Sequence, residues 1–122
     1  MEFFRDFLRN RHLGQVAFGL QRLTGILLAI YLLPHVLLNG TALVAGPEAF
    51  DALARSLDTP FVHGVELLVI LGVVVHGFNG LRILLVDFLA VTRLQQRLLG
   101  VMALLGCLAM LYALWRYSGK LL

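Results

Sequence analysis

Three long apolar runs, separated by short polar segments, dominate the pattern of hydrophobic and polar positions along the chain. The runs cover about residues 20–43, 61–89 and 98–115. Each is long enough to cross a bilayer as a helix, because a hydrocarbon core of about 30 Å requires about 20 helical residues. The pattern therefore predicts an all-α membrane protein with three transmembrane helices.

Proline, glycine and polar residues mark where these runs begin and end. Gly46 and Pro47 end the first run or open the next segment, and Pro60 marks the start of the second, because proline suits the first turn of a helix. The polar cluster at 92–97 is expected to form the turn before the third run. Residues 48–57 separate apolar from polar positions at helical spacing, which predicts a short surface helix.

The first 13 residues form a further amphipathic segment. Their apolar and basic side chains separate onto two faces at helical spacing, which predicts a helix lying in the membrane interface; a frayed terminus is the alternative. The segment lacks a continuous apolar stretch followed by a small-residue cleavage site, so we expect no secretory signal. The two faces consist of Phe3, Phe4, Phe7 and Leu8, and of Arg5, Arg9 and Arg11.

The composition is typical of a small membrane protein. The chain has 122 residues, of which 60% are hydrophobic and 14% charged, whereas a soluble domain is about half apolar and a quarter charged. We expect a single domain over residues 1–122. Because three helices of mostly Leu, Val and Ala enclose little volume, we expect half of a helical bundle that a partner subunit completes. The one cysteine, Cys107, cannot form an internal disulfide and is expected to be a small core residue.

Basic residues are distributed unevenly, and this predicts the orientation in the membrane. The N-terminal flank and the segment 92–97 are rich in arginine, whereas the segment between the first two runs carries Arg55 against three acidic residues. By the positive-inside bias, the N-terminus lies in the cytoplasm and the C-terminus outside. The net charge of +3 reflects this asymmetry and gives no basis for nucleic-acid binding.

Ionisable residues interrupt the first two runs and not the third. Such a group costs about 2.5 to 3.5 kcal/mol inside a spanning helix, so it normally faces a partner, a cavity or a cofactor. His63, at the outer end of the second run, is expected to be merely interfacial and to pair with Glu66 as an i,i+3 neighbour. No nucleophile–base pattern or metal cluster is recognisable, so we expect no catalysis by the isolated chain. The ionisable residues are His35, Glu66, His76 and Arg82, with Arg22 and His63 near the ends of the runs.

His76 carries the most information among these residues. Gly72 and Gly80 lie four residues before and after it, on the same helical face, so no side chain stands directly above or below the imidazole. A flat macrocycle can lie on such a strip, with His76 as an axial ligand of haem iron. Alternatively, the glycines serve close packing of helices, and His76 forms a hydrogen bond to a neighbouring helix. The spacing alone leaves both interpretations open.

Two arginines and a second histidine complete the candidate set. Arg82 lies about 9 Å beyond His76 toward the cytoplasmic face, from which Arg22 also enters the bilayer. Guanidinium groups at that depth suit haem propionates or the head of a quinone, and snorkelling to lipid headgroups is the alternative. His35 follows Pro34, which weakens the helix by removing a backbone donor. His35 lies about 20 Å from Arg22 along the helix, nearer the outer leaflet, which predicts a site separate from that of His76.

Two motifs give the sequence a family resemblance. Q-R-L-T-G-I at 21–26 is similar to the signature H-R-x-[ST]-G, and H-G-F-N-G-L-R-I-L-L-V-D at 76–87 is similar to H-x-x-x-G-[IL]-R-H-x-x-x-D. Both signatures belong to the cytochrome b membrane-anchor subunits of succinate dehydrogenase. The length and the three predicted spans also resemble this family.

The resemblance implies roles for particular residues. His76 matches the ligand of haem b, and Arg22 matches an arginine near the ubiquinone site and a haem propionate. Arg82 matches a position that closes the second motif at the inner face. Gln21 stands where many members have histidine, and Phe18 stands where a serine often lines the quinone pocket, so the resemblance does not define the detailed quinone contacts.

The resemblance also implies cofactors and partners. Of one or two haems b we favour two, with His35 the ligand of the outer haem and His76 that of the inner one, each paired with a histidine from the partner half of the bundle. The implied partners are a second small membrane-anchor subunit, an iron–sulfur subunit, a flavoprotein subunit, the lipid bilayer and quinone, in the inner membrane of a prokaryote. A cofactor-free structural anchor and the cytochrome b subunit of another quinone-linked oxidoreductase are the alternatives.

Overall fold

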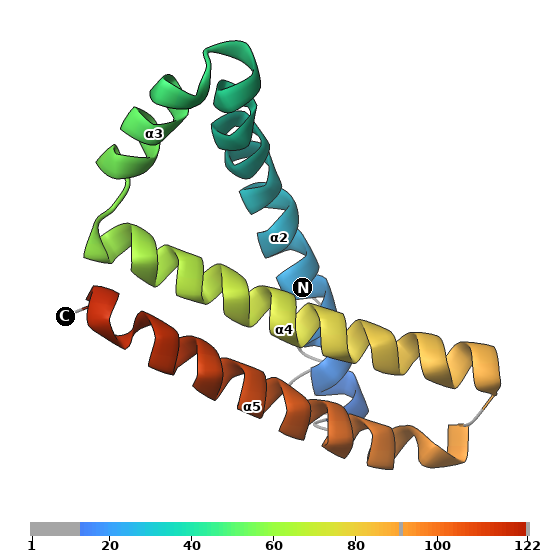
Figure 1. Ribbon diagram of the computed structural model, residues 1–122. Coiled ribbons are helices and arrows are strands. Elements are labelled where there is room, and N and C mark those ends of the chain that lie inside the picture. Colours follow the sequence, from blue (N-terminus) through green and yellow to red (C-terminus); the bar gives the residue numbers. More distant parts are fainter. Residues whose placement is uncertain (1–12, 91, 122) are drawn as a thin grey trace, which may run out of the picture.

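The computed structural model describes residues 13–90 and 92–121, and this part of the chain is helical apart from short connections (Figure 1). Three of its helices are long and apolar enough to cross a membrane, as predicted. The interfacial helix expected at about 1–13 falls, except for Leu13, outside the described residues. The long helices are α2 (Leu13–Val44), α4 (Pro60–Leu89) and α5 (Gln95–Leu121), connected by α3 (Pro47–Ser56) and the 3₁₀ turn η1 (Thr92–Leu94).

Helices α3 and α4 begin at the prolines that the sequence predicts, but the long helices extend beyond the apolar runs. Pro47 and Pro60 begin α3 and α4, and Thr59 caps α4 by accepting a hydrogen bond from the backbone N–H of Val62 at 3.3 Å. The segment 92–97 is only partly a turn, since α5 already begins at Gln95. Backbone hydrogen bonding continues through polar residues, whereas hydropathy marks only the part that fits the hydrocarbon core.

The connection between α4 and α5 turns at Ala90. This residue adopts φ 51° and ψ 30°, the left-handed conformation that usually selects glycine after a helix. The turn sends α5 back along α4, so that the two helices pack side by side over their length (Figure 1).

The first long helix packs differently from the other two. α2 crosses α4 obliquely, and its C-terminal half diverges from the α4–α5 pair, with α3 bridging the gap (Figure 1). Small residues allow the close approaches: a Cβ on Gly72 of α4 would lie 3.2 Å from the Leu27 side chain of α2, and one on Gly106 of α5 would lie 3.3 Å from that of Val74. This use of glycine is typical of helices packed in membranes.

The distribution of burial is inverted relative to a soluble protein. Large apolar side chains cover the outside of all three long helices, and no described side chain is more than 98% buried. Cys107, predicted to be a core residue, is exposed on α5, because three helices enclose too few positions to bury it. The outer surface thus requires lipid or protein around it. The buried polar residues are Thr24, His63, Asn79 and Arg82.

Candidate functional site

The two polar motifs of the first and second runs meet where α2 crosses α4. The half-buried ring of His76 points at α2: its Nδ1 lies 3.2 Å from the carbonyl oxygen of Gln21 and 3.3 Å from Oγ1 of Thr24. Its Nε2 lies 3.4 Å from Nε2 of the Gln21 amide. Residues 52 to 55 positions apart in sequence therefore form one polar site.

The neighbours of His76 define which ring nitrogen carries the proton. The Thr24 hydroxyl donates to the carbonyl oxygen of Leu20 at 2.7 Å, so its oxygen is left to accept from His76 Nδ1–H. The Gln21 amide nitrogen can only donate, so His76 Nε2 accepts. The imidazole is therefore the Nδ1–H tautomer, with its lone pair at Nε2.

Asn79 extends this site into a continuous hydrogen-bonded chain. Its Nδ2 donates to the carbonyl oxygen of Ala17 at 3.0 Å and to Oε1 of Gln21 at 2.9 Å. Its Oδ1 accepts from Nε of Arg82 at 3.0 Å. Hydrogen bonds through the amides of Asn79 and Gln21 thus link the buried guanidinium of Arg82 to the imidazole of His76. Such a network is effective in a low-dielectric interior only when its members are satisfied, as these are.

The glycines around His76 face α2. A Cβ on Gly25 would lie 3.2 Å from Cε1 of His76, and a Cβ on Gly80 would lie 3.2 Å from Nε2 of Gln21. Gly72 lies against leucine side chains of α2 in the same way. In these contacts Gly72 and Gly80 serve helix packing, which is one of the two interpretations left open by the spacing. Their use as a haem-packing face stays a prediction.

The two arginines of the candidate set lie in different environments. Arg82 is buried and bonded to Asn79, whereas Arg22 is exposed on α2 with its guanidinium carbon 5.8 Å from the centre of the Phe18 ring. That distance suits a cation–π contact. Arg82 thus belongs to the hydrogen-bonded chain, and Arg22 faces the surroundings of the helix.

A second polar cluster joins the start of α4 to the end of α5. His63 Nδ1 lies 3.0 Å from Glu66 Oε2, which confirms the predicted pair, and His63 Nε2 lies 2.7 Å from Asp58 Oδ1. The Tyr117 hydroxyl donates to Glu66 Oε2 at 3.3 Å. His63 is only 8% exposed, because carboxylates at both ring nitrogens allow its burial. Its position at the membrane interface stays a prediction. Across residues 13–90 and 92–121, no cluster of three or more acidic, histidine or cysteine residues is arranged to hold a metal ion.

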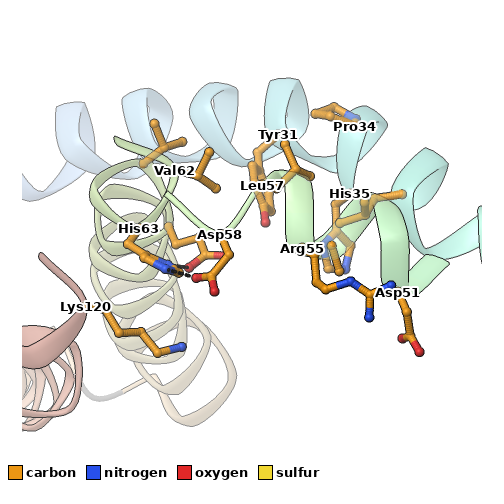
Figure 2. A pocket seen from close by; sticks show the side chains of 14 residues that line it. Tyr31, Pro34, His35, Asp51, Arg55, Leu57, Asp58, Val62, His63 and Lys120 are labelled. Atoms are coloured by element: carbon orange, nitrogen blue, oxygen red, sulfur yellow. Dashed lines mark hydrogen bonds and ion pairs between the residues drawn. The ribbon is translucent and has the colours of Figure 1, made fainter. Parts of the chain in front are cut away.

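His35 lies in a different place from His76. It is exposed on α2, with its ring centre 5.5 Å from that of Tyr31, and it lines a pocket of about 510 Å³ that His63 also lines (Figure 2). His35 follows Thr24, a neighbour of His76, by 11 residues, or about 16 Å of helix. The pocket walls come from α2, α3, α4 and, through Lys120, α5.

Comparison with known proteins decides the family. The sequence profile of the family described as succinate dehydrogenase/fumarate reductase transmembrane subunit matches residues 3–114. The chain belongs to this family. As a succinate dehydrogenase/fumarate reductase transmembrane subunit it is a multi-pass membrane protein, and the resemblance drawn from the two motifs is confirmed.

A curated relative of this transmembrane subunit supports the assignment. The succinate dehydrogenase 2 membrane subunit SdhC of Mycobacterium tuberculosis (strain ATCC 25618 / H37Rv) is 29% identical over 86 residues. The aligned region covers 70% of this chain and 62% of the relative, so the chain spans less than two thirds of the relative's length. No solved structure matches the chain.

Sequence reasoning missed three members of these two sites. Asn79 occupies an unspecified position of the second family motif, yet it joins Arg82 to Gln21. Asp58 and Tyr117 complete the His63 cluster from other segments. The available signal for Asn79 was an amide one turn from His76 in an apolar helix, which requires a partner.

Proposed function

We propose that this chain is the haem b-binding membrane anchor of a succinate dehydrogenase complex and helps to form its site of quinone reduction. The observation that carries the proposal is the contact of His76 with α2 where the two family motifs meet, with Nδ1 3.2 Å from the carbonyl oxygen of Gln21, an arrangement that favours the Nδ1–H tautomer. Neutral imidazole with a lone pair at Nε2 is the form that ligates haem iron, and a hydrogen bond from the other nitrogen to a carbonyl raises its basicity.

The residues around His76 fit an iron-bound imidazole after one adjustment. Gln21 and Thr24 hold Nδ1–H, so the ring is already oriented for ligation through Nε2. The Gln21 amide lies at Nε2 and has to turn away for a metal to bind there. Arg82 supplies a buried positive charge six residues from His76, which favours nearby anionic groups. When bound, haem b would store and pass single electrons.

We propose a second haem at His35. Its exposed imidazole and its separation from His76 support an independent outer site that a partner subunit completes. In this proposal His35 and His76 each supply one axial ligand, and the second small membrane-anchor subunit supplies the others. Arg22 and Gln21, at the N-terminal half of α2, are proposed to lie near the quinone or a haem propionate.

The exposed apolar surface supports the proposed partners. Three helices that bury so few of their side chains need a second small membrane subunit as well as lipid. Family membership supports attachment to iron–sulfur and flavoprotein subunits, with electrons passing from succinate to quinone through them. The basic residues Arg93 and Arg97 favour a cytoplasmic location for the α4–α5 turn in a prokaryotic inner membrane.

One observation favours a cofactor-free structural anchor as a second candidate. Both ring nitrogens of His76 already have partners within the chain, as expected of a histidine that only joins two helices. In that case His76, Gln21 and Asn79 act as interhelical hydrogen-bonding groups alone.

Redox-difference spectra of the purified complex test the proposal. The wild type, His35→Leu and His76→Leu are compared, with Gln15→Leu as a polar-to-apolar control elsewhere on α2. Loss of a different haem signal in each histidine variant supports two haems, and loss only in His76→Leu supports one. Haem signals unchanged in both variants would show that neither histidine is a ligand, and their absence from the wild-type complex would establish the cofactor-free structural anchor.

A further inference from the structure

We infer that Gln21 is a positioning residue that competes with iron for His76 and so lowers the affinity of this site for haem. The inference rests on the proposed function, because it assumes that His76 is the ligand. It assigns a role to a side chain that departs from the family's usual motif, and it states the direction of the effect, which is weaker haem binding at His76.

The orientation of the Gln21 amide is determined by its neighbour. Asn79 Nδ2 donates to Gln21 Oε1 at 2.9 Å, so the Gln21 NH₂ group is directed to the other side, where His76 Nε2 lies at 3.4 Å. Asn79 is itself held by the carbonyl oxygen of Ala17 and by Arg82. The donor at the ligating nitrogen is thus held by a buried hydrogen-bonded chain.

Gly80 provides the space for this amide. A Cβ at position 80 would lie 3.2 Å from Nε2 of Gln21, so the amide would have to move by a few tenths of an ångström. Gly80 and Asn79 therefore act together: one leaves room for the amide of Gln21, and the other fixes which end of it faces His76.

The hydrogen bond and the iron bond exclude each other. Neutral imidazole has a single ring lone pair, so Nε2 can accept from Gln21 or bind a metal, but not both. A hydrogen bond between membrane helices is worth about 0.6 to 1.7 kcal/mol. Removing the donor is therefore expected to tighten haem binding at His76 by about 3- to 18-fold.

Haemin titration of the intact complex provides the test. The complex is produced in a host that cannot make haem, in a His35→Leu background, so that only the His76 site is titrated by Soret absorbance. Gln21→Met keeps the length of the side chain and removes the donor. Gln15→Met makes the same substitution six residues earlier on α2 and is the matched control.

The result expected is a dissociation constant about 3- to 18-fold lower for Gln21→Met and unchanged for Gln15→Met. An unchanged or higher dissociation constant in Gln21→Met overturns the inference, and a higher one identifies Gln21 as a haem contact. These outcomes leave the proposed function intact, because haemin still binds. If the wild-type complex binds no haemin, the proposed function itself fails, and the inference fails with it.

The protonation of the His76 ring can be measured spectroscopically in the wild-type complex, so this second test does not depend on a variant that assembles. In haem-free complex with ¹⁵N-labelled histidine, His76 Nε2 is expected to be unprotonated and hydrogen-bonded, and Nδ1 protonated. A proton on Nε2 would contradict the competition, since the Gln21 amide nitrogen cannot accept it.

Discussion

A Cβ on Gly25 of α2 would lie 3.2 Å from Cε1 of the His76 ring on α4. Any larger residue at position 25 requires the ring to shift by a few tenths of an ångström. The same contact brings Nδ1 within reach of the carbonyl oxygen of Gln21. The position of the imidazole therefore depends on the absence of a side chain at residue 25.

The Gly25 contact predicts that Gly25→Val displaces the His76 ring. Valine adds a Cβ and two methyl groups beside the ring, and overpacking of this kind costs about 1–3 kcal/mol. We expect loss of most of the haem signal assigned to His76, measured by redox-difference spectroscopy of the purified complex.

Gly40→Val is the matched control, because nothing lies within 4 Å of a Cβ at position 40 of the same helix. Equal haem content in the two valine variants would show that the ring does not need this space.

The buried chain of amides predicts a strong effect of Asn79→Leu. The substitution removes the acceptor of Arg82 Nε and the donor to Gln21, and leaving buried polar groups without partners costs about 1–3 kcal/mol each. We expect a lower unfolding temperature of the detergent-solubilised complex. Asn39→Leu is the control, because Asn39 is exposed and donates to a carbonyl oxygen of its own helix. If both leucine variants unfold at the same temperature, the hydrogen bonds made by Asn79 contribute nothing to the stability of the complex.

The bond between Tyr117 and Glu66 predicts a small, local effect of Tyr117→Phe. Only the hydroxyl that donates to Glu66 is lost, so we expect a destabilisation of about 0.6 to 1.7 kcal/mol in denaturant unfolding. Tyr112→Phe makes the same change at an exposed position of α5. A double substitution with Glu66→Gln should be less than additive, because both changes affect one bond.

The α4–α5 contact predicts that Gly106→Leu is more harmful than Gly100→Leu. A Cβ at position 106 would lie 3.3 Å from Val74 Cγ1 and 3.8 Å from Phe78 Cδ2, whereas nothing lies within 4 Å of one at position 100. Gly106→Leu should cost about 1–3 kcal/mol in unfolding experiments. Similar stability of the two variants would indicate that α4 and α5 pack less closely than described.

Features that depend on local chemistry could be predicted from the sequence. Hydropathy identified the three spanning helices, since crossing a hydrocarbon core imposes length and composition on each helix independently. Proline identified the starts of α3 and α4. The His63–Glu66 pair followed from helical spacing alone.

Features that depend on which helices meet could not be predicted. Spacing places Gly72, His76 and Gly80 on one face but does not identify what that face contacts, and here it is α2. Tyr117 reaches Glu66 across 51 residues, a pairing that no local period encodes. The burial of His63 could not be predicted for the same reason, because Asp58, which allows this burial, lies outside the helix.

The Tyr117–Glu66 contact also imposes an order on biogenesis. Glu66 and His63 belong to α4, which is synthesised before α5, and Tyr117 follows Glu66 by 51 residues. The cluster of His63, Glu66, Asp58 and Tyr117 can therefore close only after α5 has returned along α4. Its closure reports that these two helices have paired.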